Sequence, residues 1–341
     1  MTSYAYTADR VDGFSVTFGE AIERFEYAPE RYLRHYGYDI ASRELQRSFG
    51  DAAARPGSVL VAVEGDLAMA VVVPNAYLSQ HFDVPIAHVL PIVSAVSDDR
   101  SELVRTALRR AAREAHAEGL ELLIHRVEAD DVEGVQGAAQ AGMRLLETST
   151  TWVNDANKAE HQVTYAGDCS FTVHYNGDVP DWSKGELDAI LGLGSRLRLV
   201  GDHYHTDRRL SDSRADDLFS EWARRSLFGE LGEVLVCVWR EGVVVGFGGW
   251  QLWSHFDERY GLRILGDGFG YVLPDAAVRS CSRGIADAVG NVMHLDCQLL
   301  EWTTQATNAP MTNVLAARKS LRYCKAAHVF HGWTDEILAG W

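Results

Sequence analysis

An internal repeat limits what this chain can fold into more than any other feature of its sequence. The polar pairs Glu64-Gly65 and Glu241-Gly242 each separate two apolar runs, which is the pattern of a β-hairpin. These two turns are 177 residues apart, and the later apolar pairs Leu122-Leu123 and Leu299-Leu300 have the same spacing. Because two landmarks recur at one spacing, the sequence predicts a single folding unit that is present twice.

The length of the chain agrees with two such units. It has 341 residues, and a domain usually has about 100 to 200. The segments at 154–158 and 176–184 are rich in turn-forming residues and lie between the two repeats. We therefore expect an N-terminal domain at residues 1–157 and a C-terminal domain at residues 158–341.

Both repeats contain the same order of predicted elements, which indicates the α+β class. In the first, Leu103, Ala107, Ala111 and Ala115 recur every four residues and mark one face of a helix. The elements expected around this helix are strands at Ile86–Val96, Leu120–Val127 and Met143–Val153, with a short helix before the last strand. The corresponding elements of the second repeat are a strand at Leu262–Leu273, a helix through Ile285, Val289 and Met293, a strand at Gln298–Thr304, a helix at Pro310–Arg318 and a strand at Ala326–Trp333.

The charge of the chain is strongly acidic. There are 48 Asp and Glu residues against 32 Lys and Arg, which gives a formal net charge of −16. Coulomb repulsion would oppose the approach of such a surface to nucleic acid or to an anionic membrane, so we expect neither as a partner. Between residues 279 and 325 the balance reverses, with six basic residues and three acidic ones, which favours a small anionic ligand there.

The ends and the cysteines of the sequence suggest a cytoplasmic protein. Met1–Arg10 lacks the layout of a signal peptide, and no apolar run approaches the ~18 residues that span a bilayer. The five cysteines are widely spaced without a C-x-x-C pair, so we expect them to be reduced and Cys237 to lie in the core. A monomer and a homodimer both remain open.

Several short motifs resemble those of the GNAT (general N-acetyltransferase) superfamily, here as a tandem pair. They are LSQHFDVPIA at Leu78–Ala87, the segment Gly119–Val153, the segment Ser195–Trp222, TTQATN at Thr303–Asn308 and VFHGW at Val329–Trp333. They are similar to motifs of the dTDP-fucosamine N-acetyltransferase group and span most of residues 78–333. The resemblance implies tandem duplicated GNAT folds, each with a mixed, mostly antiparallel sheet flanked by helices.

The resemblance also implies acetyl-CoA, or another acyl-CoA, as a co-substrate. In this superfamily a glycine-rich loop from a strand to a helix offers free N–H groups and a helix dipole to the diphosphate. The second-repeat loop lies between Pro274 and Ile285, and two registers remain open: Ala277-x-x-Ser280-x-Ser282 and Arg279-x-x-Ser282-x-Gly284. The implied cofactor-binding residues are Tyr271, Val272, Arg279, Ser280, Ser282, Arg283, Gly284 and Asn308.

The same loop of the first repeat, Ser97–Glu102, has three acids and no glycine. A diphosphate would be repelled by these carboxylates. We therefore expect a degenerate N-terminal domain and an acyl-CoA site in the C-terminal domain alone.

The general acid that would protonate the departing thiolate is a separate question. The resembled group uses a tyrosine seven residues after the Asn of TTQATN, and Leu315 stands at that position here. The candidates to replace it are Tyr323, Cys324, His328 and His331. Transfer assisted by the substrate or by water also remains open, because this chemistry depends largely on positioning the amine against the thioester.

Residues Arg196, His203, Tyr204 and His205 lie in a segment that borders the acceptor pocket in the resembled group, so the resemblance implies that they bind the acceptor. Two histidines and Asp207 also contain the ingredients of a metal site, but no third ligand follows at a recognisable spacing, so we expect no metal. A polar loop without a ligand is the third interpretation.

The glycine-rich run Gly266–Gly270 has neither the P-loop residues nor the G-x-G-x-x-G spacing. It lies inside a predicted strand, where glycine marks a bulge, a close approach of another backbone, or simply a weaker strand. A bulge would suit a GNAT fold, because this strand bends away from its neighbour to admit the thioester.

Taken together, the motifs imply an acyl-CoA-dependent N-acyltransferase. It would transfer acetyl from acetyl-CoA to the amine of a small molecule, such as an amino sugar, a nucleotide-linked sugar or a specialised-metabolite precursor, by direct attack in a ternary complex. The alternatives are a catalytically inactive GNAT-fold protein that acts as a binding partner or scaffold, and a GNAT-fold protein with other acyl-CoA chemistry.

Overall fold

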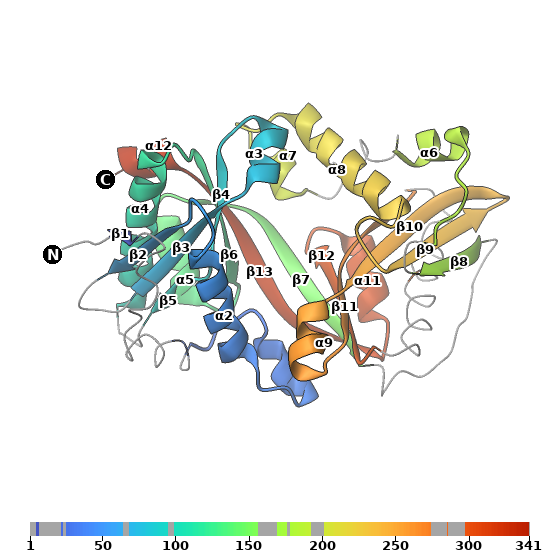
Figure 1. Ribbon diagram of the computed structural model, residues 1–341, viewed down its shortest axis with the longest axis horizontal. Helices are drawn as coiled ribbons and strands as arrows, with labels where there is room; N and C mark the ends of the chain where they lie inside the picture. Colours follow the sequence, from blue (N-terminus) through green and yellow to red (C-terminus); the bar gives the residue numbers. More distant parts are fainter. Residues whose placement is uncertain are drawn as a thin grey trace. The chain divides into compact units, whose positions relative to one another are not determined.

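The computed structural model describes residues 5–6, 22, 25–63, 68–94, 99–155, 169–175, 178–191, 201–273, 285 and 297–340 (Figure 1). The chain forms two compact units. Unit 1 contains residues 1–148, 206–209 and 325–341, and unit 2 contains residues 149–205 and 210–324. Unit 1 thus takes two short segments from the second half of the sequence. The predicted boundary between residues 157 and 158 concerns the repeats and stays a prediction.

Unit 1 contains one mixed sheet in the order β1-β2-β3-β4-β6-β13, with β5 paired to β3. The strands are β1 (Ala5–Tyr6), β2 (Val59–Val63), β3 (Ala68–Pro74), β4 (Ile86–Val89), β5 (Val93–Ser94), β6 (Leu122–Glu128) and β13 (Leu321–Trp333), which belongs to unit 1 from Lys325 onward. Its helices are the 3-10 helix η2 (Arg31–Tyr36) and α2 (Ala41–Ala53), α3 (Ala76–Phe82), α4 (Arg100–Ala117), α5 (Val132–Gln140) and α12 (Thr334–Ala339).

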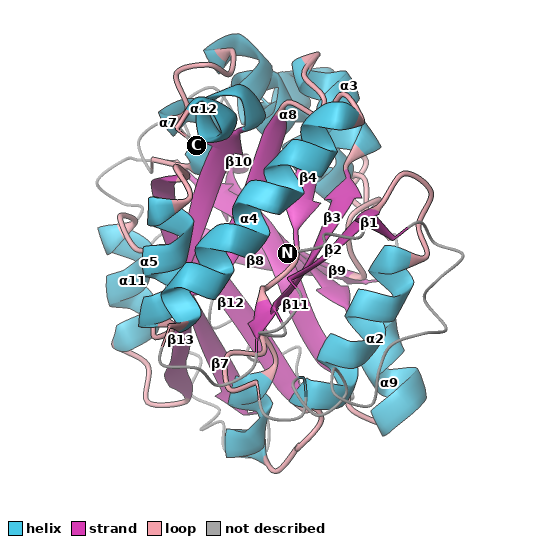
Figure 2. Ribbon diagram, turned by 90° about the vertical axis from the view of Figure 1, so that its left-hand side faces the viewer, coloured by secondary structure: helices cyan, strands magenta, loops and turns pink. Residues whose placement is uncertain are grey.

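Helix α4 lies across the strands of unit 1 (Figure 2). The predicted stripe of Leu103, Ala107, Ala111 and Ala115 is buried against the sheet, so this helix prediction is confirmed. Small side chains let the helix approach the strands closely. Helix α2 covers the opposite face with Leu45 and its apolar neighbours, which closes the second layer of the core.

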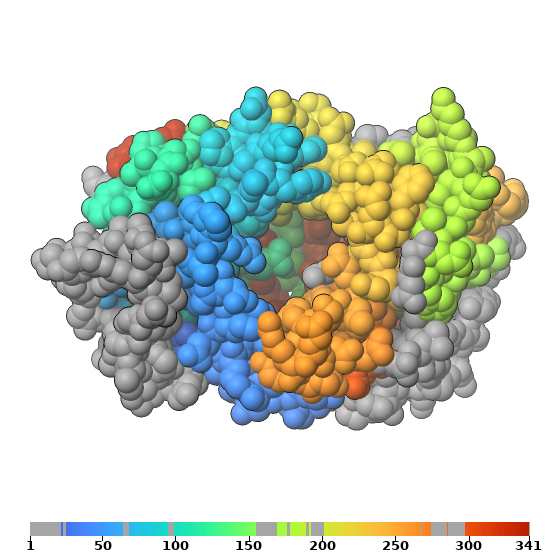
Figure 3. Space-filling view, viewed as in Figure 1, coloured from blue at the N-terminus to red at the C-terminus, as the bar shows by residue number. Residues whose placement is uncertain are grey.

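Unit 2 contains strands in the order β7-β12-β11-β10-β9-β8. They are β7 (Arg144–Asp155), β8 (Cys169–Tyr175), β9 (Val234–Arg240), β10 (Val243–Leu252), β11 (Ile264–Val272) and β12 (Leu299–Gln305). The helices are α6 (Lys184–Leu191), α7 (His203–Thr206), α8 (Asp212–Leu227), α9 (Ser254–Tyr260) and α11 (Ala309–Ala316). Helices α2 and α8 lie at the surface of their own units in Figure 3, in blue and yellow.

The β9–β10 hairpin turns at Glu241 and Gly242, as predicted. Both residues have positive φ, 50° and 77°, and Arg240 pairs with Val243 across the turn. Two consecutive residues with positive φ match the twist of a two-residue hairpin loop. The equivalent turn at Glu64-Gly65 lies outside the described residues.

The predicted spacing of 177 residues recurs in the positions of the structural elements. Strands β6 and β12 begin at Leu122 and Leu299, and the helices that follow are capped by Asp131 and Asn308. Each cap side chain accepts a hydrogen bond from the backbone three residues on, which satisfies one of the helix's free N–H groups. The duplication is therefore present in the fold as well as in the sequence.

Three sequence expectations need correction. The strand predicted at Ile86–Val96 is two strands, β4 and β5, and β13 begins at Leu321, five residues before the predicted start. Cys237, Cys297 and Cys324 are thiols, with Cys237 fully buried, but Cys169 is in a disulfide whose partner lies outside the described residues. Of the helix predicted through Ile285, only that residue is described.

None of the helices that the structure describes combines the length and apolarity that a bilayer crossing requires.

Candidate functional site

Strands β11 and β12 of unit 2 begin as parallel partners and then part. Only two residue pairs join them, Ile264 with Leu299 and Leu265 with Leu300. Beyond this point β11 stays on β10 as far as Val272, whereas β12 stays on β7 along its whole length. Within the described residues, β11 therefore has one edge without a β12 partner from position 266 onward.

A bulge in β11 explains why the strands part where they do. Gly249 pairs with Phe269 and Gln251 with Gly266, so the single residue Trp250 faces two residues of β11, at positions 267 and 268. An extra residue of this kind bends a strand and increases its twist. The bulge follows the last β11–β12 pair directly, so it turns β11 away from β12.

Glycine is needed on both sides of this bulge. A Cβ atom at Gly268 would lie 2.5 Å from the Trp250 ring, and one at Gly266 would lie 2.6 Å from the Trp253 ring. A Cβ atom at Gly270 would lie 2.3 Å from the carbonyl oxygen of Phe247 on β10. Of the interpretations left open for this run, the structure supports a bulge together with close approach of rings and backbone.

Aromatic side chains lie on the α8 side of β11 beyond the bulge. Phe269 contacts Phe219 and Trp222 of α8, with ring centroids 6.2 and 5.8 Å apart, and Phe247 lies 4.8 Å from Tyr271. Phe219 also stacks on His205, 5.7 Å away with the ring planes 8° apart. Burial raises the pKa of the Tyr271 phenol above its ordinary value.

Two carboxylates hold His205 in place. Its Nδ1 lies 2.6 Å from Asp202 Oδ2 and its Nε2 lies 3.0 Å from Asp216 Oδ1. Asp202 also accepts hydrogen bonds from the backbone N–H groups of Tyr204 and His205. The imidazole is therefore fixed against the ring of Phe219 rather than free to rotate.

The structure joins two sets of sequence-predicted residues in one cluster. Tyr204 and His205, predicted to bind the acceptor, contact Phe219, which reaches Tyr271 through Phe269 and Phe247. His203 contacts Tyr204, with ring centroids 3.9 Å apart and the ring planes tilted by 36°. Arg196 lies outside the described residues. The three rings between the two sets lie on α8, β11 and β10. They were not predicted, because no local pattern links a helix to strands that follow much later in the sequence.

Asn308 and Val272 are the other described members of the predicted cofactor set. The Oδ1 atom of Asn308 accepts a hydrogen bond of 3.2 Å from Met311 N and so begins α11, while Val272 is the last residue of β11. Leu315, at the position of the family tyrosine, is fully buried in the core under α11. The predicted residues Arg279, Ser280, Ser282, Arg283 and Gly284 lie outside the described residues.

The three predicted catalytic residues all lie on β13 but in different units. Tyr323 belongs to unit 2, is 54% exposed and packs edge-on against Trp152 of β7, while β12 lies between β7 and β11. His328 and His331 belong to unit 1. His328 Nδ1 lies 2.9 Å from Thr148 Oγ1, and burial lowers the pKa of His328.

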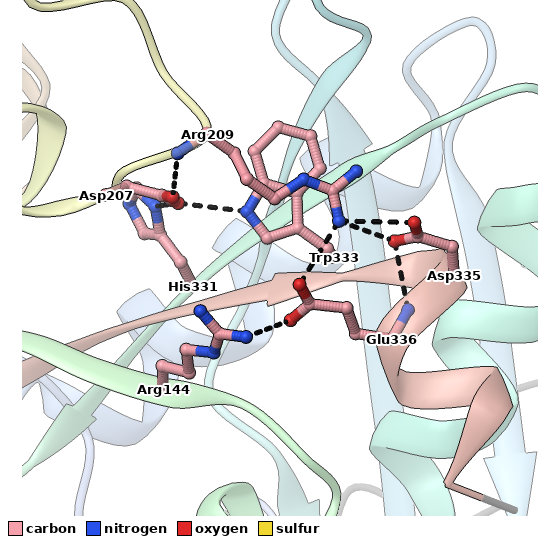
Figure 4. Close-up of polar contacts among 7 residues, drawn as sticks. All are labelled: Arg144, Asp207, Arg209, His331, Trp333, Asp335 and Glu336. Atoms are coloured by element: carbon pink, nitrogen blue, oxygen red, sulfur yellow. Dashed lines mark hydrogen bonds and ion pairs between the residues drawn. The ribbon is translucent and has the colours of Figure 1, made fainter.

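His331 takes part in a buried polar cluster of unit 1 (Figure 4). Asp207 Oδ2 lies 2.7 Å from His331 Nδ1 and accepts a hydrogen bond of 3.0 Å from Trp333 Nε1. Burial tends to raise the pKa of Asp207, but these contacts and the N–H of Arg209 outweigh it and hold the pKa below its ordinary value. His331 is 1% exposed and holds Asp207 through this contact.

Arg209 completes this cluster at the surface. Its guanidinium lies 3.7 Å above the Trp333 ring and donates to Asp335 and Glu336 at 2.9 and 3.3 Å. Glu336 is also 2.8 Å from Arg144. The sequence offered no signal for this arrangement, since Asp207 stands in a polar loop and its buried partners are 124 and 126 residues away.

Unit 1 also contains a pair of parallel strands that part. Strands β4 and β6 pair from Ile86 with Leu122 to Val89 with His125, after which β5 pairs only with β3. Here Arg100 joins the two ends: its Nε donates to Ser94 Oγ of β5 at 2.9 Å, and its guanidinium forms a two-pronged ion pair with Asp131, beyond the end of β6.

Two aromatic rings also lie against Arg100 in unit 1. The Arg100 guanidinium lies 5.5 and 5.2 Å from the rings of Phe25 and Tyr27. Arg100 and Asp131 are 6% and 4% exposed, so the ion pair is shielded from water. The place beside these parting strands is therefore filled by the protein's own side chains.

Two solved structures are similar to nearly the whole chain. A GCN5-related N-acetyltransferase from Sphaerobacter thermophilus aligns with a TM-score of 0.56 and 13% identity over 98% of this chain and 95% of its own. A tandem GNAT protein from the clavulanic acid biosynthesis pathway aligns with a TM-score of 0.50 and 13% identity over 98% of both chains. The chain therefore has an α+β fold of the tandem GNAT type.

No protein-family model matches the sequence, and no curated protein matches it either. The likeness to solved structures establishes the fold alone, and the dTDP-fucosamine group receives no support from it.

Proposed function

We propose that this protein is an acyl-CoA-dependent N-acyltransferase whose acyl-CoA site lies between β11 and β12 of unit 2. The acyl group is acetyl, and the acceptor is the amine of a small molecule. The observation that carries the proposal is the bulge at positions 267 and 268, which frees one edge of β11 within a fold of the GNAT type.

A free strand edge suits this co-substrate for a simple reason. The pantetheine arm of coenzyme A contains two amide groups, and the N–H and C=O groups of an unpaired strand can bind them as they would bind another strand. The sequence-predicted loop at Arg279–Gly284 would follow β11 and hold the diphosphate. Asn308 caps the start of α11, the helix that follows β12.

The reaction needs positioning more than it needs a protein acid. The amine nitrogen attacks the thioester carbonyl, an N–C bond forms, the C–S bond breaks, and the thiolate takes the proton that the nitrogen gives up. Leu315 has no proton to give, and Tyr323 on β13 is separated from β11 by β7 and β12. We therefore propose that the rate enhancement comes from positioning the amine against the thioester, and that the substrate or a water molecule carries the proton.

Isothermal titration of the full chain with acetyl-CoA tests the proposal. We expect binding in the micromolar range, weakened at least about tenfold in the double variant Arg279→Ala/Arg283→Ala, because each arginine lost removes a charge-assisted contact with the diphosphate. The matched control is Arg105→Ala/Arg113→Ala on α4 of unit 1, which should bind as the original chain does. Absence of binding at millimolar acetyl-CoA would refute the proposal.

The buried Leu315 favours a second candidate function, that of an inactive GNAT-fold protein acting as a scaffold. The two candidates differ in one readout. The enzyme releases free coenzyme A when an acceptor amine is added, whereas the scaffold binds acetyl-CoA, or fails to bind it, without turnover.

A further inference from the structure

The aromatic cluster of unit 2 has two zones that differ in exposure. Phe219, Phe247 and Tyr204 are buried, whereas Trp222, Phe269 and Tyr271 are half-buried. The half-buried rings Phe269 and Tyr271 stand on the stretch of β11 that β12 leaves unpaired. A purely structural aromatic core would cover these rings. Here they keep accessible surface next to the proposed thioester position.

The cluster is also rigid. His205, fixed between Asp202 and Asp216, stacks on Phe219, and Phe219 in turn stacks on Phe269 with the ring planes 20° apart. Trp222 meets both Phe219 and Phe269 nearly edge-on, at 5.4 and 5.8 Å. Trp222 and Phe269 each contact three other rings, so these two half-buried rings are preorganised to receive a planar group without losing side-chain freedom on binding.

Two carboxylates lie at one end of the cluster. Asp202 and Asp216 lie at its His205 end, and Asp216 keeps 20% of its side chain exposed. Carboxylates and the faces of aromatic rings both attract a protonated amine. The same groups would repel the diphosphate of a nucleotide-linked sugar.

We infer that the acceptor is a primary alkylamine that carries an aromatic ring. This inference rests on the proposed function and names the substrate class of that site. The acceptor ring packs against Trp222 and Phe269, where offset or edge-on contacts contribute beyond simple burial. Its amine is drawn in as the cation, gives up a proton to water, and attacks the thioester beside β11.

The test uses the full chain with three probe amines: 2-phenylethylamine, its saturated counterpart 2-cyclohexylethylamine, and glucosamine. With acetyl-CoA present, we expect kcat/KM for 2-phenylethylamine to exceed that for glucosamine by at least about 30-fold and that for the saturated amine by about fivefold. Product formation is followed by mass and coenzyme A release by thiol titration. A preference for glucosamine, or equal rates with all three amines, overturns the inference.

Two variants locate the site. Phe269→Leu and Trp222→Leu keep apolar bulk and should raise KM for 2-phenylethylamine about tenfold. Trp222 lies on α8 and not on β11, so Trp222→Leu should leave the acetyl-CoA affinity unchanged. The control is Phe228→Leu, a 39% exposed aromatic at the end of α8 that lies outside the cluster, which should leave KM unchanged. An unchanged KM in both cluster variants overturns the placement of the acceptor.

Direct titration of 2-phenylethylamine without acetyl-CoA separates this inference from the proposed function. Binding that Phe269→Leu weakens supports the aromatic site even if acetyl-CoA does not bind, in which case only the proposed function fails. Acetyl-CoA binding with no detectable aromatic amine binding, alone or in the ternary complex, leaves the proposed function standing and overturns the acceptor class.

Discussion

Units 1 and 2 share a pair of parting parallel strands but surround it with different side chains. In unit 1, Arg100 bridges Ser94 and Asp131 across the strand ends, and the ion pair is buried under two aromatic rings. In unit 2, Asn308 stands at the position equivalent to Asp131, and in the part of the chain that the structure describes β11 has no β12 partner from position 266 onward. Both units therefore contain parting parallel strands, and unit 1 places a buried cation and anion beside them.

The largest effect should come from neutralising the buried pair of unit 1. Asp131→Asn introduces the residue type of unit 2 and keeps a helix cap, but it leaves the Arg100 charge buried without a counter-charge. We expect a loss of about 3–5 kcal/mol in the free energy of unfolding, measured by urea denaturation. Asn308→Ala, which removes only a helix cap, should cost about 1 kcal/mol. Equal losses in both variants would contradict the contrast between the units.

Acid should destabilise unit 1 through two buried histidines. Burial lowers the pKa of His88 and of His125 to about 4, with Arg126 and His331 adding to the effect at His88. The folded state keeps both rings neutral, whereas the unfolded chain takes up protons near pH 6.5. Stability is therefore complete above pH 6.5 and falls as the pH drops toward 4, by about 2 kcal/mol for each ring at pH 5.

The measurement is urea denaturation of the original chain and of His125→Leu at pH 7 and at pH 5. The variant is expected to be less stable at pH 7, because the carbonyl oxygen of Val89 loses its hydrogen-bond partner. Between pH 7 and pH 5, however, its free energy of unfolding should fall by about 2 kcal/mol less than that of the original chain. A pH dependence identical to that of the original chain would show that His125 does not titrate as its burial implies.

The smallest effect concerns Tyr323 of unit 2. Because β7 and β12 separate it from β11, Tyr323→Phe should lower kcat by less than about threefold, whereas loss of a true general acid costs about 10²- to 10⁴-fold. Steady-state kinetics with saturating acetyl-CoA decide the matter. A loss of a hundredfold or more, with KM unchanged, would restore Tyr323 as the proton donor.

Local sequence patterns predicted much of the secondary structure and the repeat. The helix stripe of α4, the hairpin at Glu241-Gly242 and the repeat spacing depend on residues close in sequence, and the structure contains all three. The start of β13 was missed because Arg322–Lys325 is polar and lacks the apolar alternation of a half-buried strand.

The parts of the site that depend on long-range contacts could not be predicted from the sequence. Three elements are joined where His205 stacks on Phe219 and Phe219 stacks on Phe269. The sequence pattern of one element does not predict which other elements it will contact. The buried Asp207 was read as a loop residue for the same reason, since His331 and Trp333 come from the far end of the chain. Glycine gave the one usable long-range signal, at Gly266–Gly270, because the lack of a side chain implies a close neighbour.

Hydrogen–deuterium exchange with and without acetyl-CoA tests the difference between the units most directly. Acetyl-CoA should slow the exchange of backbone N–H groups at residues 266–272 of β11 and leave those at residues 90–94 of unit 1 unchanged. Protection at residues 90–94, or none at residues 266–272 while acetyl-CoA is bound, would contradict the assignment of a single acyl-CoA site to unit 2.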